Sequence, residues 1–242
     1  MSRIAAMLLE VCIEDSAGLA AAIDGGADRI ELCSALAIGG LTPSAGLMRE
    51  AGQRQLPCYA MIRPRAGNFV WSAEDMEVMY GDIDIARSAG LAGVVLGASL
   101  PDGRLDRESL DKLVRHAEGL GLTLHRAFDL VPDWRDAIEI AVDLGFERIL
   151  TSGGKVTAPD GIEALETLVA LAAGRISIMP GSGINPQTVS TLIPRLEITD
   201  IHASCSSSAA SSDPRLVSLG FAPALERRTD GAVVRALKAL VT

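Results

Sequence analysis

The chain has 242 residues, enough for one large α/β barrel or two ordinary domains, and its formal charge is −9. This acidic balance, without any block of basic residues, argues against a nucleic-acid-binding protein. No segment approaches the ~18 consecutive apolar residues of a membrane span, and Glu10 interrupts the apolar run at Met7-Leu8-Leu9, so a signal peptide is not expected either. The four cysteines are widely spaced and form no CxxC pair, which predicts a reduced, cytoplasmic protein.

Short apolar runs alternate with helical patterns about eight times along the chain. The expected strands are Leu8–Ile13, Arg29–Cys33, Cys58–Pro64, Gly93–Gly97, Leu122–Asp129, Arg148–Ser152, Ile176–Pro180 and Asp200–Ser204. The expected helices are Ser16–Asp24, Pro43–Gln53, Ser72–Ser88, Asp106–Glu118, Trp134–Leu144, Gly161–Ala172, a short helix capped by Asn185-Pro186 and ending near Ile193, and Thr229–Leu240. The stretches Gly26-Ala-Asp-Arg-Ile-Glu-Leu and Gly145-Phe-Glu-Arg-Ile-Leu-Thr repeat the same helix-to-strand junction.

This alternation predicts an α/β protein with a single (β/α)8 TIM-barrel domain over residues 1–242, closed by the helix Thr229–Leu240. The segment Ser206–Glu226 is rich in Ser, Ala and Pro and is expected to be a long irregular loop.

Several strands carry ionisable residues on the face that should point into the barrel. A period of two places these side chains inward: Glu10, Cys12, Glu31, Cys33, Arg63, His125, Asp129, Thr151, Asp200, His202 and Ser204. Buried polar groups need partners or a ligand, so the pattern indicates either a satisfied structural network or a binding site at the barrel mouth.

The first two strands share an apolar-Glu-apolar-Cys pattern, Leu9-Glu10-Val11-Cys12 and Ile30-Glu31-Leu32-Cys33. Neighbouring parallel strands lie ~4.8 Å apart, so two inward thiols could together hold Cu(I). The alternative is that both cysteines only pack in the core, where free cysteines are common.

Two glycine-rich turns follow late strands, Thr151-Ser152-Gly153-Gly154-Lys155 and Pro180-Gly181-Ser182-Gly183. Glycine lets backbone N–H groups converge on an anion, and (β/α)8 barrels often bind phosphate in this region. Simple turn chemistry is the alternative interpretation. The predicted ligand-binding residues are Arg63, Arg126, Thr151, Ser152, Gly153, Gly181, Gly183 and His202.

The chain resembles the CutC copper-homeostasis family in a series of stretches that run in order from about residue 8 to 205. They are Leu9-Glu-Val-Cys12, Gly25-Gly-Ala-Asp-Arg-Ile-Glu-Leu-Cys33, Gly39-Gly-Leu-Thr-Pro-Ser44, Met61-Ile-Arg-Pro-Arg65, Leu124-His-Arg-Ala-Phe-Asp129, Arg148-Ile-Leu-Thr-Ser-Gly153, Ile178-Met-Pro-Gly-Ser-Gly183 and Ile201-His-Ala-Ser204. The resemblance implies a (β/α)8 barrel, a cytoplasmic location, a homo-oligomer and Cu(I) binding at Cys12 and Cys33. Asn68 stands where the family more often has Asp, and Ser206–Glu226 matches the family poorly.

Two functions are therefore expected. The first is copper homeostasis, with Cu(I) bound by Cys12 and Cys33. The second is an enzyme acting on a small anionic metabolite, phosphorylated or sugar-like. Its predicted catalytic residues are His125 as general acid/base, Glu10 and Glu31 as interacting carboxyl groups, and Asp129.

Overall fold

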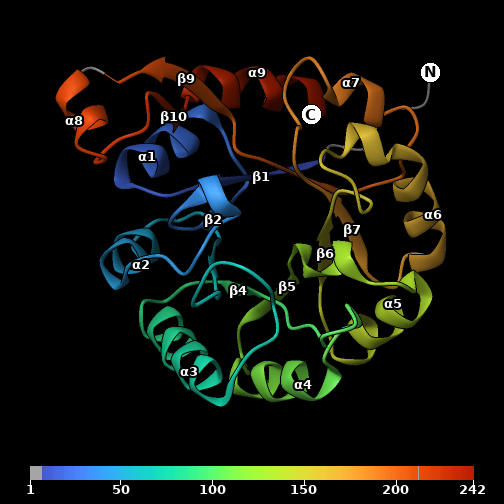
Figure 1. Cartoon of the computed structure of the whole chain (residues 1–242). Helices are drawn as coiled ribbons and strands as arrows, with labels where there is room; N and C mark the ends of the chain where they lie inside the picture. The colour runs from blue at the N-terminus through green and yellow to red at the C-terminus, as the bar shows by residue number, and fades with distance from the viewer. Residues whose placement is uncertain (1–6, 212) are drawn as a thin grey trace.

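The structure is a computed structural model that describes residues 7–211 and 213–242. A ring of strands lies at the centre and the helices surround it (Figure 1). The ring strands are β1 (Leu8–Ile13), β2 (Arg29–Leu32), β3 (Cys58–Met61), β4 (Gly93–Leu96), β5 (Gly121–Leu124), β6 (Arg148–Thr151), β7 (Ser177–Pro180) and β8 (Asp200–Ala203). The surrounding helices are α1 (Ser16–Gly25), α2 (Ala45–Gly52), α3 (Ala73–Ser88), α4 (Arg107–His116), α5 (Trp134–Asp143), α6 (Ile162–Ala172), α7 (Val189–Leu192) and α9 (Gly231–Val241).

All eight strands belong to one parallel sheet. They follow the order β7-β6-β5-β4-β3-β2-β1-β8, and the two end strands, β7 and β8, lie side by side. The sheet is therefore a nearly closed barrel, and the predicted (β/α)8 fold is confirmed. Within the described ranges, no helix is long and apolar enough to cross a membrane.

Capping residues in the sequence explain where several helices begin and end. The Ser72 hydroxyl accepts a hydrogen bond from the Asp75 backbone, and the Asp75 carboxylate accepts one from the Ser72 backbone, both at 3.1 Å. This reciprocal capping box starts α3 where the sequence predicts it. Gly26 ends α1 in the left-handed conformation, with φ of 90°, which glycine adopts without steric penalty.

The two faces of the barrel strands differ in polarity. Toward the helices they present apolar side chains such as Leu9, Val11 and Ile30, none of which is exposed. The barrel interior instead contains buried charged residues, including Glu10 and Arg29. A charged group in a protein interior is tolerated only when it is paired, so the interior must be organised by hydrogen bonds and ion pairs.

The strand expected over Leu122–Asp129 is too long. β5 ends at Leu124, and a 3-10 helix follows over Arg126–Leu130. His125 starts this helix because its Nδ1 accepts a hydrogen bond from the Ala127 backbone at 3.1 Å. The alternation of side chains that is typical of a strand therefore stops before Asp129. The inference that Asp129 and His125 lie on the same face of one strand is wrong.

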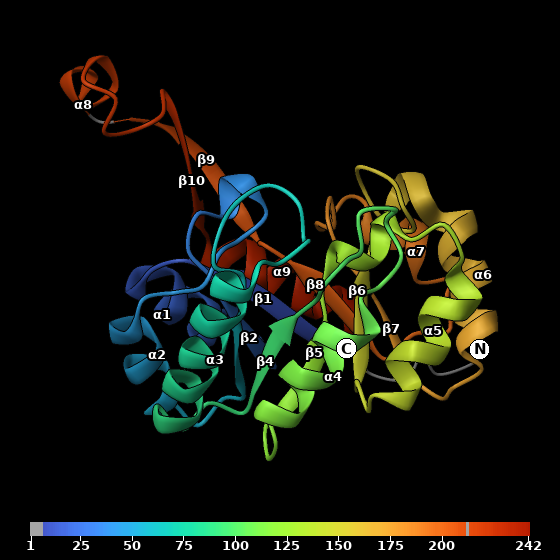
Figure 2. The same ribbon diagram turned by 60° about the horizontal axis from the view of Figure 1, so that its bottom comes forward.

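The prediction of an irregular loop over Ser206–Glu226 is also wrong. β9 (Ser206–Ala210) and β10 (Leu225–Thr229) pair antiparallel, with α8 (Pro214–Ser218) between them. Figure 2 shows this arm projecting away from the barrel. Its small and polar residues are typical of loops, but the two strands satisfy each other's backbone groups by pairing. The expected helix Thr229–Leu240 corresponds to α9, and the helix expected after Asn185-Pro186 is reduced to the four residues of α7.

Candidate functional site

The register between strands sets the levels of the barrel interior. Glu10 on β1 lies opposite both Arg29 on β2 and His202 on β8. Cys12 lies two residues further along β1, opposite Glu31. Glu10, Arg29 and His202 therefore share one level, and Cys12 and Glu31 share the next level toward the carboxyl ends of the strands, where barrels bind their ligands.

Glu10 is the centre of the deeper level. It accepts hydrogen bonds from Arg29 Nε and from His202 Nδ1, the latter at 2.8 Å. Burial alone would raise the pKa of Glu10, but the His202 hydrogen bond and the Arg29 charge hold it at about 2. Arg29 also donates to Asp200 at 2.9 Å. Glu10 is thus a fixed carboxylate that orients its neighbours, and after burial its negative charge also raises the pKa of Glu31.

Two arginines and a tyrosine fill the amino-terminal end of the interior. The guanidinium carbons of Arg29 and Arg148 lie 5.7 and 4.9 Å from the centre of the Tyr59 ring. Arg148 donates to the Thr123 hydroxyl at 2.9 Å, and the Tyr59 hydroxyl donates to Glu147 at 3.0 Å. Our sequence reasoning missed these residues, although the repeated Asp-Arg-Ile and Glu-Arg-Ile junctions place an arginine at the start of both β2 and β6.

A cluster of potential metal ligands lies above this network. Cys12, Glu31 and His202 each offer one ligand atom, and the three atoms lie within 4.8 Å of one another. His202 Nδ1 bonds to Glu10, so its Nε2 is the nitrogen that faces Glu31, at 3.7 Å from Oε2. A carboxylate that fixes the second nitrogen of a histidine is typical of metal sites.

The charges of this cluster favour a cation. Burial would lower the pKa of His202, but Glu31, Cys12 and Glu10 together raise it well above the ordinary value. Burial raises the pKa of Glu31. Glu31 Oε1 is buried and has no hydrogen-bond partner in the part of the chain that the structure describes. The donor set and this unpaired oxygen fit a bound metal ion.

Cys33 lies outside this cluster. Because Cys12 is opposite Glu31, Cys33 lies two residues further toward the carboxyl ends of the strands than the residue opposite Cys12. Binding of Cu(I) by Cys12 and Cys33 together stays a prediction. The Cys33 thiol donates to Glu31 Oε2 at 3.4 Å and packs with Tyr59, Met61 and Val95. Burial and the nearby Glu31 raise the pKa of Cys33 well above its usual range. Identical sequence patterns on two strands did not reveal the offset between them.

Arg63 lies at the carboxyl end of β3, as predicted, and is 6% exposed. Its Nη1 donates to the carbonyls of Ile38 and Gly40 at 2.9 and 3.0 Å, and its Nη2 donates to Gly67 at 3.0 Å. Its buried Nε has no hydrogen-bond partner, and no carboxylate among the described residues forms a salt bridge with it. Arg63 is thus a nearly buried cation without a counter-charge.

His125 lies close to Arg63 and is 2% exposed. Burial and the positive charge of Arg63 lower its pKa to about 3. Nδ1 accepts from the Ala127 backbone, so the hydrogen of the neutral ring is assigned to Nε2, which is buried without a partner in the described ranges. Near neutral pH this geometry favours a hydrogen-bond donor over the predicted general acid/base. Gly97 makes room for the ring, since a Cβ there would lie 2.4 Å from His125 Cε1.

Asp129 binds the glycine-rich turn after β6. Its Oδ1 accepts from the Thr151 hydroxyl at 2.6 Å, from the Ser152 backbone at 3.1 Å and from the Gly154 backbone at 3.0 Å. Its Oδ2 accepts from Arg126 Nε at 2.7 Å. The anion site predicted at this turn is therefore occupied by the chain's own carboxylate, and a catalytic role for Asp129 is not favoured.

The other predicted residues of these turns also have structural partners. Arg126 Nη2 donates to the Ser152 hydroxyl at 2.7 Å, and the Gly153 backbone donates to the Thr151 hydroxyl at 2.9 Å. In the second turn, the Gly181 backbone donates to the Thr151 carbonyl at 3.0 Å, and Gly183 has φ of 72°. Both turns thus hold the carboxyl ends of β6 and β7 together.

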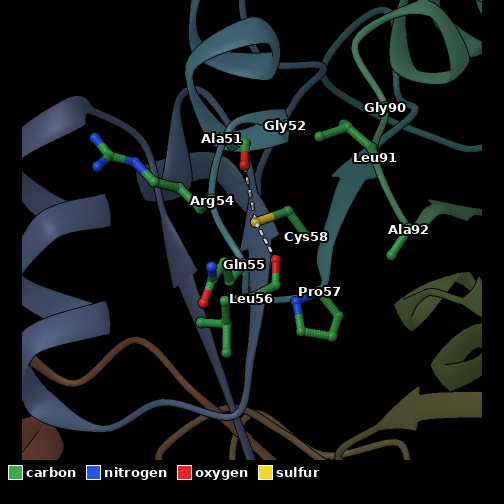
Figure 3. Close-up of a pocket in the computed structure, with 10 residues that line it drawn as sticks. All are labelled: Ala51, Gly52, Arg54, Gln55, Leu56, Pro57, Cys58, Gly90, Leu91 and Ala92. Atoms are coloured by element: carbon green, nitrogen blue, oxygen red, sulfur yellow. Dashed lines mark hydrogen bonds between the residues drawn. The ribbon is translucent and has the colours of Figure 1, made fainter.

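A cavity of about 190 Å³ lies at the opposite end of the barrel, before β3 and β4 (Figure 3). The buried Cys58 thiol donates to the Leu56 carbonyl there at 3.3 Å, and burial raises the pKa of Cys58 to about 11. This cavity is far from the charged clusters of the barrel interior, and its thiol is protonated and unreactive.

Fold and site together define a (β/α)8-barrel protein with a buried Cys-Glu-His cluster near its mouth. The model of the CutC family matches residues 7–207, and the chain belongs to this family. A family protein CutC of Sinorhizobium medicae is 65% identical over 239 residues, which cover 99% of this chain and 96% of that protein. One from Agrobacterium fabrum is 55% identical over 98% of this chain and 94% of its own.

One solved structure supports the same assignment, and a second shares the fold. A structure from Streptococcus agalactiae that is named as a copper homeostasis protein CutC has 33% identity and a TM-score of 0.78, and the match covers 82% of this chain and 98% of that one. A thiamine phosphate pyrophosphorylase from Pyrococcus furiosus is 15% identical with a TM-score of 0.59, and covers 97% of this chain and 95% of its own. The second likeness shows the fold alone.

Proposed function

We propose that the chain binds Cu(I) through Cys12, Glu31 and His202 and serves copper homeostasis in the cytoplasm. The observation that carries this proposal is the cluster itself: three potential ligands within 4.8 Å of one another, of which His202 is oriented by Glu10. Cys33 is a neighbour of the site through its hydrogen bond to Glu31, not one of its three ligands.

The donor set suits copper. A thiolate is the ligand that soft Cu(I) prefers, and an imidazole nitrogen also binds copper. The four cysteines are free and buried, which fits a reducing compartment where copper would be Cu(I). Copper homeostasis is also the role in the name of the streptococcal relative.

Replacing Cys12 by serine should weaken Cu(I) binding by about 100-fold, because it removes the soft ligand of the site. The measurement is an anaerobic titration against a competing Cu(I) chelator. Cys58→Ser is the matched control, since Cys58 is equally buried but lies at the other end of the barrel. Cys33→Ser should weaken binding by about tenfold, because Cys33 bonds to the ligand Glu31 and not to the metal. Wild-type affinity in Cys12→Ser, or equal losses in Cys12→Ser and Cys33→Ser, would contradict the proposed ligand set.

We further infer that the mouth receives a small anionic metabolite, because Arg63 is a buried cation without a counter-charge. Ligand binding to the folded state raises stability, by ~2.7 kcal/mol when the ligand is present at 100 times its Kd. A thermal-shift screen of anionic metabolites should therefore contain at least one compound that raises the melting temperature of the wild type and not of Arg63→Gln. A screen without such a compound would remove this second function.

We infer that the chain self-associates through its projecting arm. Leu219, Phe221 and Leu225 are 68, 77 and 59% exposed there, and large apolar groups gathered on a surface favour association. Sedimentation should show an oligomer for the wild type and a smaller species for Phe221→Ser. Val156→Ser is the matched control, because Val156 is 83% exposed but lies outside the arm. A monomeric wild type would refute the inference.

A further inference from the structure

Three buried polar atoms lie unpaired at the carboxyl ends of three neighbouring strands. They are Arg63 Nε after β3, Ser99 Oγ after β4 and His125 Nε2 after β5, in residues that are 6, 3 and 2% exposed. A buried donor or acceptor without a partner destabilises a fold by about 1–3 kcal/mol. Three such atoms on adjacent strands indicate a ligand that pairs with them. This set is distinct from the metal cluster, whose ligands come from β1, β2 and β8.

One loop covers this set of donors. The Phe69 ring centre lies 4.8 Å from the His125 ring centre and 4.9 Å from the Arg63 guanidinium carbon. The Ser99 backbone donates to the Phe69 carbonyl at 2.8 Å, so the same residue contacts all three strand ends. Trp71 anchors the loop by donating its indole N–H to the Gly97 carbonyl at 2.8 Å. Phe69 shields the donors from water, which strengthens their attraction for a charged ligand.

The charge of these three donor groups defines the chemical class of the ligand. Arg63 supplies one positive charge, whereas Ser99 and the neutral His125 supply uncharged donors. The neighbouring Arg65 is already paired with Asp75 at 3.0 Å. The glycine-rich turn after β6 is occupied by Asp129. One cation with two neutral donors matches a singly charged carboxylate, and a phosphate dianion would be left with uncompensated charge.

We propose that Arg63, Ser99 and His125 bind a small carboxylate beneath Phe69. The Arg63 Nε–H and the Ser99 hydroxyl donate to the carboxylate, and the His125 Nε2–H donates to a second oxygen of the ligand. This inference rests on the proposed anion-binding function of the mouth and narrows it to one class of ligand.

Three small probes test the proposal. Calorimetric titrations at constant ionic strength compare glycolate, its uncharged analogue glycolamide, and inorganic phosphate. Glycolate should bind the wild-type protein at least tenfold more tightly than either competitor, and it should shift the nitrogen resonance of His125 Nε2. Arg63→Gln should weaken glycolate binding at least tenfold. Arg104→Gln, an exposed arginine paired with Asp102, should leave it unchanged.

The outcomes distinguish failure of the carboxylate proposal from failure of the broader proposal that the mouth binds an anion. Tighter binding of phosphate than of glycolate, lost in Arg63→Gln, would overturn the carboxylate while leaving an anion site. Failure of both anions to bind would overturn the anion site as well. If Arg63→Gln does not fold, two measurements on the wild type test the proposal instead. They are the ratio of the glycolate and glycolamide affinities and the shift of the His125 Nε2 resonance when glycolate is added. Equal binding of glycolate and glycolamide would contradict a charged ligand.

Discussion

Arg29→Ala should lower the free energy of unfolding by about 3–5 kcal/mol, because it removes a buried cation that pairs with two buried carboxylates, Glu10 and Asp200. Arg29 donates to Glu10 and Asp200, and its Nη2 also contacts Met179 Sδ at 3.3 Å. The truncation also leaves a cavity beside Tyr59, which adds to the loss. Urea unfolding at constant pH and salt measures the effect.

Arg195→Ala is the matched control for this prediction. Arg195 also makes two hydrogen bonds to a carboxylate, both to Glu166 at 2.7 Å, but the pair is exposed. Exposed pairs contribute little to stability, because water and salt screen them. Similar losses in both variants would show that burial of the Arg29 network does not matter. If Arg29→Ala gives no folded protein, Arg29→Lys provides the same comparison with a smaller loss.

Stability should fall as the pH is lowered from 6.5 toward 3, and His125 should contribute one proton to this dependence. Its pKa is about 3 in the folded chain and near the ordinary 6.5 in the unfolded chain. Between these values the unfolded state binds a proton that the folded state excludes, so stability decreases with falling pH by about 1.4 kcal/mol per pH unit. His202 acts in the opposite direction: its raised pKa gives stability that is lost as pH rises above 6.5.

His125→Asn isolates this contribution, because asparagine offers an acceptor to the Ala127 backbone but does not titrate. The slope of unfolding free energy against pH between 6.5 and 5 should decrease by about 1.4 kcal/mol per pH unit in the variant. His116→Asn on α4 is the control, since that ring is partly exposed and contacts Asp84 at the surface. An unchanged slope in His125→Asn would mean that His125 has about the same pKa in the folded and the unfolded chain.

Most elements of the fold could be predicted from alternating apolar runs, but their ends could not. The prediction for β1 matches residue by residue, because its alternation is long and a cap follows it at Asp15. Other predicted strands extend past the structural ones, since apolar residues continue into the loops that bury them. At His125 a side-chain hydrogen bond to the backbone, which no periodicity signals, ends the strand and starts the 3-10 helix.

The alternation of inward and outward side chains along the predicted strands correctly identified four ionisable residues as buried. They are Glu10, Glu31, His125 and His202. Which of these residues meet depends on strand register, and register is a tertiary property that one strand's pattern does not contain. For this reason the sequence suggested Cys12 with Cys33, whereas the structure places Cys12 opposite Glu31. The sequence likewise could not show that the glycine-rich turn binds Asp129, because that contact depends on the 3-10 helix that carries it.

X-ray absorption at the copper edge tests the proposed metal site most directly, because it reports the atoms bound to the metal. The protein loaded with one equivalent of Cu(I) should show one sulfur neighbour, from Cys12, together with lighter neighbours that include the imidazole of His202. The spectrum should be the same in Cys33→Ser. Two sulfur neighbours in the wild type that fall to one in Cys33→Ser would contradict the Cys12-Glu31-His202 site. That result would instead support Cu(I) binding by Cys12 and Cys33 together.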